Sequence, residues 1–155
     1  MKDQEQLIKL FTDLFDGSPW IDVNIVNTLD EITAKEAATK PFPDFNSIWE
    51  IVNHVISWRD TVLKRVHGEN IESPEDNYFS FIRDRSENSW QKTKERFRES
   101  QVKWLKDIKK FKSKELHAKH DFSTFSNYEL MLGVVQHDAY HLGQIRLMKK
   151  LVQLT

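Results

Sequence analysis

The apolar residues of this chain recur mostly at every third or fourth position, and this spacing limits what the chain can fold into. Such a spacing gathers apolar side chains on one face of an α-helix, whereas a half-buried strand alternates with a period of two. Residues that break helices are also rare, because 155 residues contain only four Gly and four Pro. Few breakers favour long helices over many short strands joined by turns. We therefore expect an all-α protein.

The length and composition indicate a single domain. The 155 residues are few for two domains, and five Trp and ten Phe supply large apolar side chains for one core. No apolar run approaches the roughly 20 residues of a membrane span, and the polar N-terminus lacks the apolar stretch of a secretory signal. We therefore expect one domain over residues 1–155 and a cytoplasmic location. The absence of Cys excludes disulfides and thiolate metal ligands.

Four segments have the length and the apolar pattern of a long helix. Ser47 with Glu50, and Ser126 with Glu129, have the S-x-x-E spacing of a capping box at a helix start. Gly68 is typical of a helix end. Four long helices with short or medium connections predict an up-down four-helix bundle. The long helices are expected over residues 3–15, 46–67 and 86–112, and from Ser126 onward.

The remaining segments are shorter or irregular. Helical spacing resumes over residues 20–29, and Thr33 to Glu36 resembles a short capped helical turn. Residues 69–85 and 113–125 are expected to be loops.

A basic stretch covers residues 83–114, which hold 12 Lys and Arg against 5 Asp and Glu. Such a stretch can mark a nucleic-acid partner. Its basic residues, however, fall between the apolar positions of an expected helix, without aromatic residues on the same face. We interpret the stretch as a solvated helix face and do not expect nucleic acid to be a partner.

Three histidines stand where an apolar residue is expected. On the last helix the core-facing positions are 130, 134, 137, 141, 145 and 148, and two of them are His137 and His141. Four residues of separation places both imidazoles on one face of a helix. His54 lies in the core-facing series of the helix over 46–67. Three imidazoles from two helices are thus predicted to point into one interior.

Buried imidazoles need partners for their nitrogens, because burial of an unpaired polar group is costly. A divalent metal ion meets this need, and three protein ligands leave coordination positions open, as in catalytic sites. The alternative is a set of core histidines with ordinary hydrogen bonds. His67 is interpreted as a partner for the C-terminal dipole of its helix, and His117 and His120 as surface residues.

A competing motif overlaps the pair, because His137 to His141 reads H-D-x-x-H, close to the H-E-x-x-H of zinc peptidases. In those enzymes a third ligand usually follows downstream, but residues 142–155 contain no His, Asp or Glu. A peptidase is therefore not expected. Asp138 is instead expected either to interact with the metal ligands or to face a partner.

The ligand region resembles a known family. Gln136 to Ile145, QHDAYHLGQI, is similar to the C-terminal signature of the DinB-like superfamily of metal-binding four-helix bundles. Ser47 to His54 resembles the family's helix with the first ligand, and Gly17 to Trp20 resembles a turn often found after its first helix.

This resemblance implies an all-α DinB-like bundle with His54, His137 and His141 as ligands for nickel, zinc or iron, and a homodimer. Some relatives are S-transferases that use low-molecular-weight thiols such as bacillithiol or mycothiol, and many others are described as metal-dependent hydrolases without a known reaction. A chain without Cys would take such a thiol as a small molecule.

Two functions remain open at this point. The first is a metal-dependent enzyme, either a hydrolase or a thiol S-transferase with a small-molecule substrate. The second is a non-catalytic, metal-stabilised bundle that dimerises or binds a partner. Around the ligands, Asn53 and Trp58 are candidates for the wall of a pocket, and Gln144 for a hydrogen bond near the site. Gly143 is a candidate for the close approach of another helix.

Overall fold

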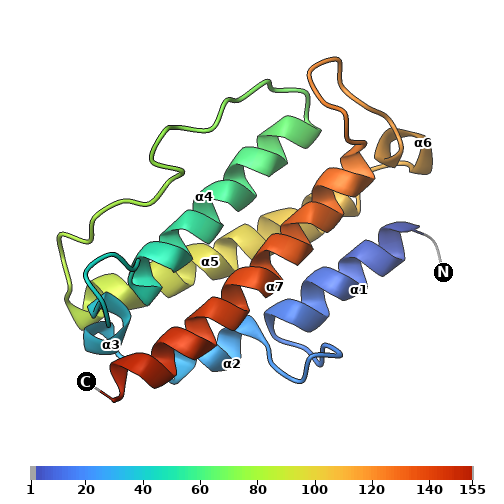
Figure 1. Cartoon of the computed structure of the whole chain (residues 1–155). Coiled ribbons are helices and arrows are strands. Elements are labelled where there is room, and N and C mark those ends of the chain that lie inside the picture. Colours follow the sequence, from blue (N-terminus) through green and yellow to red (C-terminus); the bar gives the residue numbers. More distant parts are fainter. Residues whose placement is uncertain (1–2, 155) are drawn as a thin grey trace.

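Seven helices are present in the computed structural model, which describes residues 3–154 (Figure 1). No β-strand occurs within this range, and none of its helices is long and apolar enough to cross a membrane. The expected all-α class is therefore confirmed. The helices are α1 (Asp3–Phe15), α2 (Ile25–Asp30), α3 (Ala34–Ala38), α4 (Ile48–Val66), α5 (Glu87–Ile108), α6 (Ser113–Leu116) and α7 (Asn127–Val152).

The four longest helices pack against one another around a common interior. In Figure 1, α7 lies between α4 and α1, and α5 lies behind them. Helices α4 and α1 both contact α5 as well as α7. The core between them has two apolar clusters, one around Trp49 and Trp90 and the other around Trp104 and Met131. The pair α4 and α7, which carries the three histidines, has the most extensive contact of any two helices.

The predicted helix starts are confirmed by their side-chain caps. Ser47 and Glu50 form a full capping box at the start of α4, and Ser126 and Glu129 form one at the start of α7. A third box caps α3, where Thr33 pairs with Glu36. Each box satisfies backbone N–H groups that the first helical turn leaves without partners. These caps fix where α4 and α7 begin, and therefore where their histidines lie.

Two predicted boundaries are wrong. The helix expected over residues 20–29 begins only at Ile25, because Asp22 has a φ of 60° and Asn24 caps the helix with its side chain. Trp20, expected to be helical, is 96% exposed in the preceding turn. The helix expected over 86–112 ends at Ile108, and the short helix α6 lies in the segment 113–125 that was expected to be a loop.

A buried ion pair joins α4 to α7 beside the histidines. Arg59 Nε donates to Asp138 Oδ2 at 2.8 Å, and both side chains are 1% exposed. Arg59 Nη2 also donates to Gln101 Oε1 on α5 at 2.9 Å, and Gln101 Nε2 donates to the carbonyl of Phe11 on α1 at 2.9 Å. The guanidinium lies over the rings of Phe11 and Phe97. One polar network therefore connects all four long helices.

We predict that breaking this pair from one side destabilises the protein strongly. Arg59→Met leaves the Asp138 carboxylate buried without a cation and should lower the free energy of unfolding by about 3–5 kcal/mol. The double variant Arg59→Met/Asp138→Leu should recover most of that loss, because no charge remains buried. Urea unfolding in the presence of a chelator measures both values.

The matched control is Lys9→Met, which removes an exposed pair with Asp13 on α1. Its cost should stay below about 1 kcal/mol. If Arg59→Met cost no more than Lys9→Met, the buried pair would not hold the helices together.

Candidate metal centre

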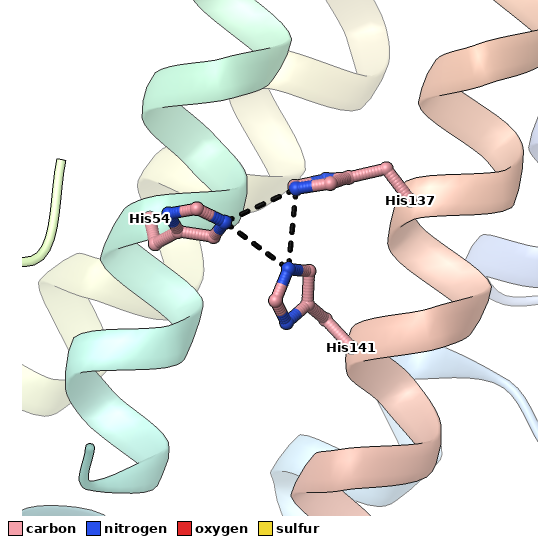
Figure 2. A group of neighbouring side chains, drawn as sticks. All are labelled: His54, His137 and His141. Atoms are coloured by element: carbon pink, nitrogen blue, oxygen red, sulfur yellow. Dashed lines mark hydrogen bonds between the residues drawn. The ribbon is translucent and has the colours of Figure 1, made fainter. Parts of the chain in front are cut away.

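The three predicted histidines meet between α4 and α7 (Figure 2). His54 Nε2 lies 3.1 Å from His137 Nε2 and 3.1 Å from His141 Nε2, and the last two atoms are also 3.1 Å apart. Three ring nitrogens from two helices thus form an almost equilateral triangle. His54 and His141 are buried, and the His137 side chain is 29% exposed.

The hydrogen bonds of the Nδ1 atoms show which ring nitrogen carries the proton in His54 and in His141. His54 Nδ1–H donates to the carbonyl oxygen of Asn77 at 2.6 Å, and His141 Nδ1–H donates to Gln144 Oε1 at 2.7 Å. Because both acceptors are carbonyl oxygens, each neutral ring carries its proton on Nδ1 and an electron pair on Nε2. The contact between His54 and His141 therefore has no proton to share. A cation at the centre of the triangle would remove this repulsion.

The spacing of the nitrogens fits one transition-metal ion. Imidazole nitrogens that bind such an ion at about 2.0–2.1 Å lie roughly 2.8–3.4 Å apart at octahedral or tetrahedral angles. The observed separations of 3.1 Å fall inside this range. The hydrogen bonds on Nδ1 are those that usually orient a metal-bound imidazole. The donor set and its surroundings therefore fit a divalent ion.

Burial keeps all three imidazoles in the neutral form that binds metal. Burial has the largest effect on His137, and together with the neighbouring His141, His54 and Arg59 it lowers the pKa of His137 to about 3. Burial also lowers the pKa of His54 and of His141, although the hydrogen bonds to Asn77 and Gln144 act in the opposite direction. Protons therefore compete poorly for these nitrogens near neutral pH.

The segment between α4 and α5 supplies contacts that the sequence pattern did not predict. The Phe79 ring stacks on the His54 ring, with centroids 4.1 Å apart and planes at 7°. Asn77 accepts a hydrogen bond from Trp58 Nε1 on its side-chain oxygen at 2.9 Å, in addition to the bond from His54 on its carbonyl. Asn77 and Tyr78 both have positive φ, 50° and 62°. This unusual turn aims the carbonyl at His54.

A cavity of about 710 Å³ opens beside the triangle, and all three histidines line it. This size falls within the range of small-molecule sites. Trp58 is in its wall, as predicted, and so is Gln144, for which we predicted only the hydrogen bond near the site that it makes with His141. Asn53 is not among the residues that line it, and its side chain instead accepts a hydrogen bond from Arg96 on α5. The other lining residues are Asp44, Phe45, Asn46, Ile51, Asn77, Phe79, Tyr140, Leu147 and Met148.

A sequence comparison assigns the family. The family model of the DinB superfamily matches residues 23–145, which include all three histidines. The chain belongs to the DinB superfamily. No curated protein and no solved structure matches it.

The other residues of the motif have definite places in this DinB-superfamily protein. Asp138 is turned into the core, where Arg59 neutralises it. Its Oδ1 lies 4.0 Å from His137 Nδ1 and has no hydrogen-bond partner. Burial raises the pKa of Asp138, and Arg59 acts against this rise. Asp138 thus does not face the cavity as the acid of a peptidase motif would.

Gly143 does not serve the close approach that we predicted for it. The residue is exposed, and a Cβ added there would meet no atom within 4 Å.

The remaining histidines lie outside the cluster. His67, which caps the C-terminal end of α4, bonds Asp107 at 3.1 Å, and the exposed His117 bonds Asp3 at 2.7 Å. His120 lies 3.2 Å from the carbonyl of Val66.

We predict that the metal-free protein loses stability as the pH falls below about 6.5. The unfolded chain takes up protons on its histidines near their ordinary pKa of 6.5, whereas the folded cluster takes them up only at lower pH, for His137 near pH 3. Protonation therefore favours the unfolded state between these values. Urea unfolding in the presence of a chelator, from pH 8 to pH 4.5, measures the change in the free energy of unfolding.

The triple variant His54→Gln/His137→Gln/His141→Gln is the control, because it keeps every carboxylate. Its free energy of unfolding should fall less steeply over the same interval. Parallel curves for the two proteins would contradict the assignment of low pKa values to the cluster.

A further prediction concerns the acceptor on His141. Gln144→Leu removes the oxygen that orients the ring, and should weaken metal binding by about 10–100-fold. Gln144→Glu keeps an acceptor at the same place and should bind metal at least as tightly as the native protein. Competition with a chromophoric chelator measures both affinities. Equal losses in the two variants would indicate a packing role rather than orientation of His141.

Proposed function

We propose that this protein is a metal-dependent enzyme of the DinB superfamily that holds a nickel, zinc or iron ion on His54, His137 and His141. The observation that carries the proposal is the convergence of three Nε2 atoms at 3.1 Å, two of them with no proton, beside a cavity of about 710 Å³. A structural metal site is usually closed by four protein ligands, and this one has three. We further propose that α1, α4, α5 and α7 are the four helices of an up-down bundle.

The ion would act as a Lewis acid and lower the pKa of a water molecule or a thiol bound to it. These two cases correspond to a hydrolase and to an S-transferase that uses a low-molecular-weight thiol. The chain contains no Cys, so a thiol in this reaction has to come from a small molecule.

Other residues of the protein orient the histidines and line the cavity. The Asn77 carbonyl and Gln144 hold His54 and His141 in orientation, and Phe79 covers one face of His54. Trp58 forms part of the wall of the cavity. Asp138 is paired with Arg59 in the core and is not free to accept a proton from a substrate. Apart from the histidines, the titratable side chains that line the cavity are Asp44 and Tyr140.

The second candidate is a non-catalytic module in which the metal stabilises the bundle. The pairing of Asp138 with Arg59 favours it, because this pairing removes the acidic residue nearest to the ligands from proton transfer. The two candidates differ in what the cavity does. An enzyme turns over a substrate there, whereas a module gains only stability from the ion.

Elemental analysis of protein purified without an affinity tag tests the site. We expect about one divalent ion per chain, and strong loss of it in His54→Gln, His137→Gln and His141→Gln. His117→Gln, at an exposed histidine outside the cluster, should keep the ion. Unchanged metal occupancy in the three cluster variants would contradict the assignment of the site to these histidines.

The reaction class is tested with the same proteins after loading with the metal. A panel of esters and amides assays hydrolysis, and a thiol with an alkylating electrophile assays S-transfer. The enzyme hypothesis predicts turnover in one panel that the cluster variants lose and His117→Gln retains. Full occupancy without turnover in either panel, together with a rise in melting temperature on metal binding, would favour the non-catalytic module.

A further inference from the structure

A second cavity adjoins the candidate metal centre. It has a volume of about 490 Å³ and lies between α4 and α7, on the side toward the start of α7. Trp58 and His137 line both cavities, whereas His54 and His141 line only the larger one. His137 therefore stands at the boundary between the two cavities.

The two cavities differ in chemistry. The larger one has polar side chains in its wall besides the histidines, among them Asp44, Asn77 and Gln144. In the smaller one, Arg59 Nε is paired with Asp138 and Arg59 Nη2 with Gln101, while Arg59 Nη1 has no hydrogen-bond partner within residues 3–154. Glu129 is committed to the cap of α7. Most of the wall that remains is apolar, formed by Trp58, Val62, Phe125, Leu130, Leu132 and Val134.

A glycine keeps the smaller cavity open. Gly133 lies in its wall, and a Cβ built there would meet no atom within 4 Å. Close packing therefore does not require a glycine at this position, although glycine in a helix interior is unfavourable by roughly 0.5–1 kcal/mol relative to Ala. A larger side chain at this position would project into the cavity.

We propose that the substrate of this metal centre carries a bulky apolar group, which occupies the cavity lined by Gly133 while its polar reacting end lies at the histidines. The inference rests on the proposed metal function, because the histidines then define where the reacting end is. Burial of an apolar group beside His137 would hold the substrate in one orientation.

A series of straight-chain hydroxamates tests the proposal, since the hydroxamate head chelates the metal and only the tail length changes. Isothermal titration calorimetry on the metal-loaded protein compares acetohydroxamate with butano-, hexano- and octanohydroxamate. We expect the affinity to rise by about fourfold per methylene until the cavity is full. An affinity that does not depend on tail length would overturn the proposal.

Two glycines on α7 give a matched pair of variants. Gly133→Leu fills the apolar cavity, and should weaken octanohydroxamate binding by about tenfold or more while acetohydroxamate binding stays within about twofold of native. Gly143→Leu makes the same change at an exposed position that lines neither cavity, and should leave both affinities unchanged. Each variant replaces a glycine of α7 with Leu, which has a higher helix propensity, so we expect both variants to fold.

The outcomes separate this proposal from the proposed function. If metal occupancy is native and Gly133→Leu does not alter the dependence on tail length, the apolar group binds elsewhere and the proposal fails, while the metal function stands. If Gly133→Leu instead changes only the oligomeric state in sedimentation, the cavity belongs to an interface and the proposal also fails. If the native protein binds no metal, both the function and this inference fall together.

Discussion

The buried pair of Arg59 and Asp138 is the interaction on which the arrangement of the site depends. Two charges that are 1% exposed are tolerated only in contact, so the pair fixes how α4 and α7 lie along each other. The two helices run in opposite directions (Figure 1). His54 precedes Arg59 by five residues, about 7.5 Å along α4, and that step brings it level with the stretch of α7 just after Asp138. His141 lies in that stretch and His137 lies just before Asp138, and His54 Nε2 is 3.1 Å from the Nε2 atom of each.

The same pair explains why the acidic residue next to His137 does not line the cavity beside the histidine cluster. Asp138 follows His137 directly, but one residue of a helix turns the side chain by about 100°. His137 faces the cavities and Asp138 faces the core. A carboxylate buried there without Arg59 would have its pKa raised still further by desolvation. The helix thus separates the face that carries the histidine cluster from the face that is buried in the core.

Residues whose place follows from the helical period or from a local cap signature could be predicted from the sequence. Contacts made by the segments between the helices could not. His54, His137 and His141 were found because they interrupt apolar stripes, and Ser47 and Ser126 because caps have local signatures. Nothing local indicates that Asn77 presents its carbonyl to His54, because that contact requires two consecutive residues with positive φ. Trp20 was misplaced because helical spacing continues through a turn that Asp22 and Asn24 in fact break.

The two glycines of α7 illustrate the same limit in a functional setting. By propensity alone Gly133 and Gly143 are equivalent, since each weakens the helix and each has open space around it. They differ only in what that open space is: solvent at Gly143, and an apolar cavity beside His137 at Gly133. A molecule with one polar and one apolar end could lie across His137 with each end in matching surroundings. Selection among substrates of the proposed enzyme would then depend on the apolar end, which lies in a cavity that His54 and His141 do not line.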